Sequence, residues 1–337
     1  MKPPAALLER PVPPTFSDRV EAIKAFRFTE RQARFLVTVM LHSGVCLGRQ
    51  YCAFAGIEYG APVANLFKTL QARGFATPQV CGHNRARLFH VHYKPLYAAI
   101  GEPDNRFRRP MTLARAVERL MLLDAVTADS SVSWLGTERD KLHYFTGLGV
   151  PRHDLPALTF RSADEETVRY FPEKLPIGAG ADGRTHVFLY LVTRSTPMDF
   201  RLFLERHAEL MRSLPAWTIR LLVPKHLTDA AALHREAFIE HLTCPLPAEV
   251  VDEMRWYFRA CRDGGVDLDE RFYRAQTAFA GPRFRALYRQ WLMDGERVLD
   301  AVMSPVLVDV IARRVGVLDC HVLPHPYLHL LPLVGTA

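Results

Sequence analysis

Four side chains able to bind zinc fall within twelve residues of the chain: Cys81, His83, His90 and His92. Cysteine thiolates and imidazoles are the usual zinc ligands, and four of them can complete a tetrahedral site. His90 and His92, however, would project from the same side of an expected strand, about 7 Å apart, with no acidic residue nearby to orient them. We therefore expect no metal here. A second loose set near the C-terminus is interpreted in the same way: Cys320, His321, His325 and His329.

Asp182 precedes the apolar run HVFLYLVT, the position at which restriction-type nucleases carry an acid of their metal site. Such a site also needs an acid and a lysine at the far end of the strand, to hold the metal and activate water. The strand, 187–193, contains neither. The chain also lacks G-x-S-x-G, P-loop and G-x-G-x-x-G motifs in suitable surroundings. We therefore expect no catalytic residue and no cofactor, and a metal-dependent nuclease with acids from elsewhere stays open as an alternative.

The N-terminal part of the chain is predicted to be a run of short helices. Thr29 and Gln32 have the spacing of a capping box, in which each side chain bonds a free backbone N–H of the other residue. Apolar residues then recur at helical spacing as far as Gly44, which suits the left-handed residue that ends many helices. A shorter helix over about 49–55 is expected next.

The stretch APVANLFKTLQARG, residues 61–74, predicts a third helix with two different faces. Its apolar side chains at 63, 66, 67 and 70 share one face and should be buried. The other face is expected to point outward as a candidate DNA contact, and it carries Ala61, Asn65, Lys68, Thr69 and Arg73. Asparagine can pair with adenine and lysine with guanine or phosphate, while alanine and threonine can touch thymine methyls.

Two extended runs follow, FATPQV and ARLFHVHY, joined by the turn-forming letters CGHNR. They predict a β-hairpin, and three helices followed by a hairpin make the succession of a winged helix-turn-helix. Arg85 and Arg87 lie at or beside the hairpin tip, where they could reach phosphates or a narrow minor groove. His90 is expected to be exposed and to contact phosphate. Eight Lys and Arg face three Asp and Glu between residues 83 and 119, so positive charge gathers here.

The rest of the chain predicts a second domain. Residues 102–125 hold a basic entry and then an amphipathic helix, which carries the stripe Val117, Leu120, Met121 and Ala125 and is interpreted as a connecting or dimerising helix. Beyond a boundary near residue 150, the strands HVFLYLVT and WTIRLLVP flank a helix and predict a parallel β-α-β unit. Further helices follow. Over 271–291 arginines alternate with aromatic residues, and we interpret the aromatic residues as core and the arginines as solvent-facing.

Composition sets wider bounds. The 337 residues, 49% hydrophobic and 23% charged, allow two or three domains with real cores. The net charge of +7 favours an anionic partner such as nucleic acid. Six scattered cysteines indicate reduced thiols. No apolar run reaches the roughly 18 residues of a membrane helix, and the N-terminus lacks the apolar region of a secretory signal, so we expect a cytoplasmic protein.

The segments FTERQARFL, LGRQYCAFAG, VANLFKTLQARGFA and VHYKPLYAAIG, between about Phe28 and Gly101, resemble the winged-helix part of the replication-relaxation family. Proteins of that family belong to plasmids and integrative mobile elements. They pair a winged helix with a domain similar to restriction-type nucleases, often degenerate. The resemblance implies DNA binding in the replication, transfer or transcription of a mobile element.

These observations predict a mixed α+β and α/β chain in four parts: a flexible arm (1–20), a winged helix-turn-helix (21–101), a connecting or dimerisation region (102–150) and an α/β domain with extra helices (151–337). The predicted function is sequence-specific binding of double-stranded DNA by a homodimeric regulator that is not an enzyme. We expect no cofactor, no metal and no membrane contact. The alternatives are a metal-dependent DNA nuclease and a winged-helix module that binds protein while its basic side chains are merely solvated.

Overall fold

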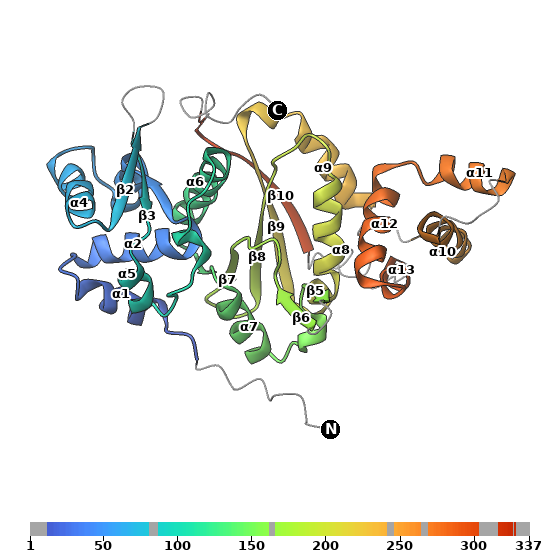
Figure 1. The fold of residues 1–337 in the computed structure, drawn as a ribbon, viewed down its shortest axis with the longest axis horizontal. Helices are drawn as coiled ribbons and strands as arrows, with labels where there is room; N and C mark the ends of the chain where they lie inside the picture. The colour runs from blue at the N-terminus through green and yellow to red at the C-terminus, as the bar shows by residue number, and fades with distance from the viewer. Residues whose placement is uncertain are drawn as a thin grey trace. The chain divides into compact units, whose positions relative to one another are not determined.

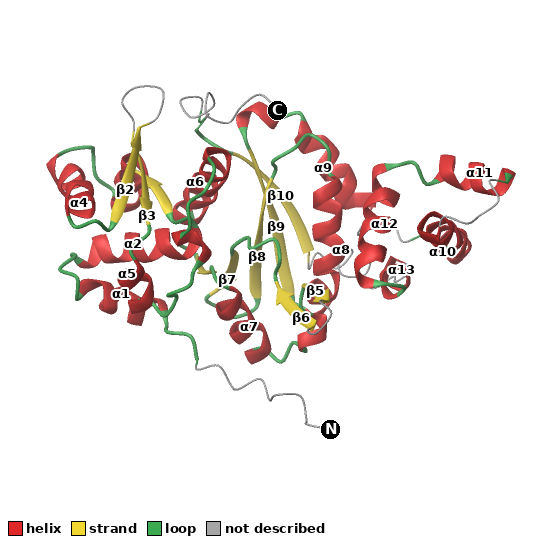
Figure 2. Ribbon diagram, viewed as in Figure 1, coloured by secondary structure: helices red, strands yellow, loops and turns green. Residues whose placement is uncertain are grey.

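The computed structural model describes residues 12–80, 87–161, 166–240, 246–263, 269–302, 316–325 and 327. Helices and strands are mixed along the chain (Figure 2), which confirms the predicted mixture of α and β structure. The chain divides into two compact units. The N-terminal unit comprises residues 1–130, 135–147 and 327–337, and the C-terminal unit comprises 131–134 and 148–326. Among the described helices, none has the length and apolar character needed to cross a membrane.

The N-terminal unit is built mainly of helices around one small antiparallel sheet with strand order β1-β3-β2 (Figure 1). Its described elements are α1 (Phe16–Lys24), α2 (Glu30–His42), β1 (Val45–Leu47), α3 (Gly48–Ala55), α4 (Ala61–Ala72), β2 (Ala76–Val80), β3 (Arg87–Val91), α5 (Lys94–Ala99), the 3₁₀ helix η1 (Arg106–Arg108), α6 (Leu113–Ala128) and α7 (Glu138–Gly147).

Helix α2 begins and ends where its sequence predicts. The Thr29 hydroxyl accepts the backbone N–H of Gln32 at 3.4 Å, and the Gln32 carboxamide accepts the N–H of Thr29 at 3.1 Å. After the last turn, Gly44 has a φ of +74°. A Cβ atom there would lie 2.7 Å from both the Cβ and the carbonyl oxygen of Phe107, so only glycine fits. The capping box and the glycine stop are therefore both confirmed.

The core of this unit joins the helices to the sheet. Phe67 on α4 stacks on Phe89 of β3 with ring centroids 4.3 Å apart. Phe35 on α2 packs 5.1 Å from the ring of Tyr51 on α3. Burial of such aromatic side chains supplies much of the hydrophobic stabilisation of a small domain. These contacts join α4 to the sheet and α2 to α3.

The apolar stripe of α6 is not a free dimerisation face. Helix α6 packs against α2, α3 and β1 of its own unit. Val117, Leu120 and Met121 are buried, and Leu123 belongs to the main core. The stripe therefore belongs to the core of the N-terminal unit, because the chain covers it with its own helices and strand β1.

The C-terminal unit contains a mixed five-stranded sheet with order β10-β9-β8-β7-β4 and a separate hairpin, β5-β6. Its described elements are β4 (Val132–Leu135), the 3₁₀ helix η2 (Arg152–Asp154), β5 (Ala157–Arg161), β6 (Glu166–Tyr170), β7 (Ile177–Gly180), β8 (Thr185–Leu191), α8 (Met198–Ser213), β9 (Ala216–Val223), the 3₁₀ helix η3 (Lys225–Leu227), α9 (Ala230–Phe238), α10 (Ala248–Asp263), α11 (Glu270–Ala278), α12 (Pro282–Asp294), α13 (Arg297–Val302) and β10 (Gly316–Val322).

Strands β8 and β9 pair in parallel and are joined through α8, which confirms the predicted β-α-β unit. Every residue of β8 after Thr185 is buried, as expected for a central strand covered on both faces. Tyr190 of β8 packs against Phe200 and Phe203 of α8, with centroids 4.7 and 5.1 Å apart. Helix α8 therefore covers the sheet along this strand (Figure 1).

Helices α10 to α13 form a group of their own within the C-terminal unit (Figure 2). Their core includes Phe258, Phe279 and Trp291. Arg271 pairs with Glu253 at 2.7 Å, on the outside of this core. Aromatic residues inside and arginines outside agree with the predicted division of the stretch over 271–291, although Tyr273 is 52% exposed.

Candidate nucleic-acid interface

Helix α4 has the two faces that its sequence predicts. Val63, Leu66, Phe67 and Leu70 are at most 4% exposed. The predicted contact residues on the other side are all exposed: Ala61, Asn65, Lys68, Thr69 and Arg73. The side chains of Asn65, Lys68 and Thr69 have no hydrogen-bond or ion-pair partner among the described residues. The polar groups of this face are therefore available to an external partner.

The predicted hairpin follows α4 directly. Strands β2 and β3 pair antiparallel, with Val80 opposite Arg87 at the end nearest the turn. The Arg87 side chain is exposed and has no partner among the described residues. Arg85, predicted to lie at the tip, falls outside the described residues. In the described part of the hairpin, Arg87 is therefore the cationic side chain that an anionic partner could contact.

Arg73 is exposed but already engaged within the N-terminal unit. One guanidinium nitrogen donates to the carbonyl oxygen of Phe26 at 2.6 Å. The guanidinium also lies over the ring of Phe75, 4.4 Å from its centroid. The charge-assisted hydrogen bond holds the end of α4 to the segment between α1 and α2, and the cation–π contact holds it to Phe75 just after the helix. Arg73 therefore positions α4, and Lys68 is the better candidate for direct contact.

The prediction that His90 is exposed is wrong. Its strand, β3, is the middle strand of the sheet, paired on both sides. The imidazole is half-buried, and its Nε2 lies 2.9 Å from the carbonyl oxygen of Phe107. Burial lowers the pKa of His90 below its usual 6.5, although the bond to Phe107 opposes the shift. The lowered pKa disfavours the charged ring, so His90 is a weaker candidate for a phosphate contact than its sequence position suggests.

Part of the positive charge between residues 83 and 119 is also internal. The guanidinium groups of Arg106 and Arg119 both lie 4.7 Å from the centroid of the Phe107 ring. Arg108 donates to the carbonyl oxygens of His92 and Pro103. Within the N-terminal unit, these arginines hold the segment around Phe107 against His92, just after β3, and against helix α6. The sequence count therefore overstates the charge that surrounds α4.

Three of the candidate zinc ligands, His90, His92 and His321, lie against other groups in the described part of the chain. Cys81 and His83 lie outside the described residues. His92 bonds the hydroxyl of Thr77 at 2.8 Å. Near the C-terminus, His321 lies 3.5 Å from Asp319, and His329 is outside the described residues. Within the described ranges, no group of three His, Cys, Asp or Glu side chains comes together in a geometry for metal binding.

Asp182 has a structural role in the turn between β7 and β8. Its carboxylate accepts the backbone N–H groups of Arg184 and Thr185, both at 2.9 Å, and the hydroxyl of Thr185 at 2.8 Å. These hydrogen bonds lower the pKa of Asp182 to about 2. A carboxylate so engaged is a turn-forming group. In the part of the chain that the structure describes, no group of acids or histidines gathers around Asp182 to hold a metal.

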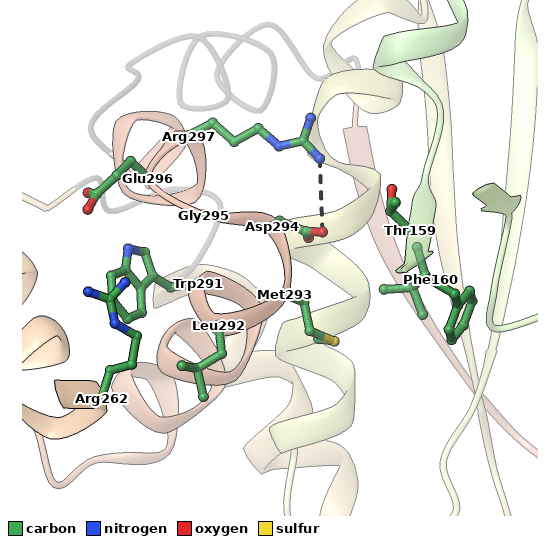
Figure 3. A pocket seen from close by; sticks show the side chains of 11 residues that line it. Thr159, Phe160, Arg262, Trp291, Leu292, Met293, Asp294, Gly295, Glu296 and Arg297 are labelled. Carbon is green, nitrogen blue, oxygen red and sulfur yellow. Dashed lines mark ion pairs between the residues drawn. The ribbon is translucent and has the colours of Figure 1, made fainter. Parts of the chain in front are cut away.

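A cavity of about 870 Å³ lies in the C-terminal unit, and Figure 3 shows its lining. It is lined by residues 158–160, Arg262 and residues 291–297. Its charged groups already have partners inside the chain. Arg262 pairs with Asp263 at 2.7 Å, Arg297 lies 3.9 Å from Asp294, and Glu296 bonds Arg255 and Arg259. The cavity therefore presents no charge arrangement that selects a ligand.

Three further residues widen the exposed face of α4. Ala64 and Gln71 are exposed on the helix itself, and Tyr59, just before it, is 71% exposed. Ala64 and Gln71 follow from the same helical spacing that selects Lys68, since they lie four residues before it and three after it. Tyr59 falls in the turn, where periodicity gives no signal.

No protein-family model, curated protein or solved structure matches the chain. The resemblance to the replication-relaxation family therefore stays a prediction from the sequence.

Proposed function

We propose that the region of residues 21–101 is a winged helix-turn-helix that binds double-stranded DNA in a sequence-specific way. Support comes from the order of elements, α2, β1, α3, α4, β2 and β3, and from the antiparallel sheet in which β1 joins the hairpin beside β3. In such a domain the last helix enters the major groove and the hairpin contacts the backbone. Here these elements are α4 and β2-β3.

The observation that carries this proposal is the contrast between α4 and its surroundings. Arg19, Arg49, Arg73 and Arg108 all bond to other parts of the unit. Asn65, Lys68 and Thr69 do not, among the described residues, although all three can make several hydrogen bonds. An unpartnered polar face beside an exposed hairpin arginine fits a nucleic-acid ligand, whose contacts are mostly polar and cationic.

The wider role follows from the resemblance of the N-terminal segments to the replication-relaxation family. On that basis the protein is a cytoplasmic regulator of replication, transfer or transcription in a plasmid or mobile element. It would bind a two-fold DNA site as a homodimer. The uncharged strand β8 and the engaged carboxylate of Asp182 support a C-terminal unit without nuclease activity.

The test is a binding titration of the full chain with random-sequence duplex DNA at two salt concentrations. We expect enrichment of particular duplexes and an affinity that falls as salt rises, because binding releases counterions from the phosphates. No enrichment would refute sequence-specific binding, and salt-independent binding would refute contact with the phosphates. Incubation with Mg²⁺ or Mn²⁺ tests the nuclease alternative: cleavage that is lost in Asp182→Asn would replace the proposed function with an enzymatic one.

A further inference from the structure

The exposed face of α4 has an unusual composition for a helix that contacts DNA bases. Between Ala61 and Ala72 the sequence contains no arginine, aspartate or glutamate, and Lys68 is its one charged residue. The exposed side chains are otherwise small or uncharged. Alanine contributes at positions 61, 64 and 72, and the polar groups belong to Asn65, Thr69 and Gln71.

These side chains match some base pairs better than others. In the major groove, guanine is contacted mainly by arginine or lysine, and the amino group of cytosine by aspartate or glutamate. Adenine is contacted by asparagine or glutamine, through its N7 and N6 atoms, and the methyl group of thymine by alanine or threonine. The face of α4 therefore has several side chains that suit adenine or thymine. Lys68 is the one that suits guanine, and none is an acid that suits cytosine.

The placement of these residues allows them to act together. Ala61, Asn65 and Lys68 are separated by four and three positions and so lie along one line of the helix. A helix of twelve residues is about 18 Å long, enough to cross a major groove about 12 Å wide. Small side chains at positions 61 and 64 leave room for the helix backbone to lie close to the base edges, within reach of Asn65.

We infer that α4 recognises a DNA core rich in A·T pairs, with Asn65 bonded to an adenine and the methyl groups of Ala61, Ala64 or Thr69 against thymine methyls. This inference rests on the proposed function, since it specifies the DNA that the same face would bind. Lys68 supplies the remaining contact, to a phosphate or to one flanking guanine.

The first experiment is a selection by the full chain from random duplexes, followed by sequencing. We expect the enriched sites to share a core of A·T pairs. Enriched sites with a G·C core would overturn this inference while leaving DNA binding intact. Absence of any enrichment would overturn both, so the two failures are distinguishable.

The second experiment removes single groups from the selected duplex. Uracil in place of a contacted thymine lacks only the methyl group, and we expect affinity to fall about fourfold for each lost methyl contact. Replacing the contacted adenine with 7-deazaadenine removes one acceptor, and we expect a loss of about tenfold. Unchanged affinity for all singly modified duplexes would contradict the inference.

The third experiment assigns the adenine contact to its residue. In Asn65→Ala, binding to the unmodified duplex should weaken, and 7-deazaadenine should cause no further loss. Because Asn65 is exposed and alanine favours helix, this variant should keep its fold. A matched control is Lys94→Ala, which removes an exposed charge outside α4 and should retain full sensitivity to 7-deazaadenine. Equal sensitivity in Asn65→Ala would exclude Asn65 as the adenine contact.

Discussion

Arg19 on α1 and Asp140 on α7, 121 positions apart in the sequence, form a two-point ion pair with N–O distances of 2.7 and 3.2 Å. Only 4% of the Arg19 side chain and 10% of the Asp140 side chain are exposed. The Nε of Arg19 also donates to the carbonyl oxygen of Ile100, and Asp140 accepts the backbone N–H of Thr137. The pair thereby ties the first and last helices of the N-terminal unit together.

We expect Arg19→Met to destabilise the N-terminal unit by about 3–5 kcal/mol, because it leaves the Asp140 carboxylate buried without its partner. The measurement is hydrogen exchange of the α1 and α7 amides during urea unfolding of the full chain. The double variant Arg19→Met with Asp140→Leu should recover part of the loss, since neither charge of the pair stays buried without its partner. Lys24→Ala, which breaks an exposed pair with Glu21, is the control. Equal stability of Arg19→Met and Lys24→Ala would contradict this account.

His42 should make the stability of the same unit depend on pH. Burial lowers the pKa of its imidazole to about 3, against 6.5 in an unfolded chain. Between pH 6.5 and pH 3, His42 is therefore protonated in the unfolded chain but not in the folded chain. The free energy of unfolding should fall as the pH drops from 6.5 toward 3. His42→Leu should remove this contribution and flatten the decline.

The measurement is urea unfolding at pH 6.5 and pH 4.5 for wild type and His42→Leu, again followed by hydrogen exchange in α2. The matched control is His153→Gln, because the His153 side chain is 80% exposed. An identical loss of stability between the two pH values in wild type and His42→Leu would show that His42 does not cause it.

Sequence motifs that span only a few neighbouring residues predicted the local backbone structure correctly. The capping box of Thr29 and Gln32 and the left-handed Gly44 after α2 are both where the sequence puts them. The division of α4 into a buried and an exposed face follows from helical periodicity. Such features depend on neighbouring residues in the sequence.

Contacts between distant residues were not predictable in this way. Arg49 and Asp124, 75 positions apart, form a two-point ion pair, and the hydroxyl of Tyr327, 203 positions from Asp124, donates to the same carboxylate. The burial of His90 depends on the 3₁₀ helix around Phe107, and the engagement of Arg73 depends on Phe26. A single sequence shows the type of each residue but not its distant partner.

Arg73 should matter more for stability than for DNA contact. In Arg73→Ala the carbonyl oxygen of Phe26 loses its donor and the ring of Phe75 loses its cation. We expect a loss of about 1–3 kcal/mol in the stability of the N-terminal unit. Affinity for a selected duplex, measured at a temperature where the variant is folded, should fall less than in Lys68→Ala. A larger fall in affinity for Arg73→Ala would show that Arg73 contacts DNA directly.

Arg87 should contact phosphate, because it is exposed at the end of the hairpin and not on the face of α4. A phosphate contact contributes equally to all sequences, and its removal lowers the salt dependence of binding. In Arg87→Ala we expect weaker binding to selected and random duplexes alike. The slope of log affinity against log salt should decrease by about 1. Asn65→Ala should instead weaken selected duplexes more than random ones and leave the slope unchanged. If Arg87→Ala keeps the wild-type slope, the hairpin does not reach the backbone, and α4 must then be held on DNA by other elements.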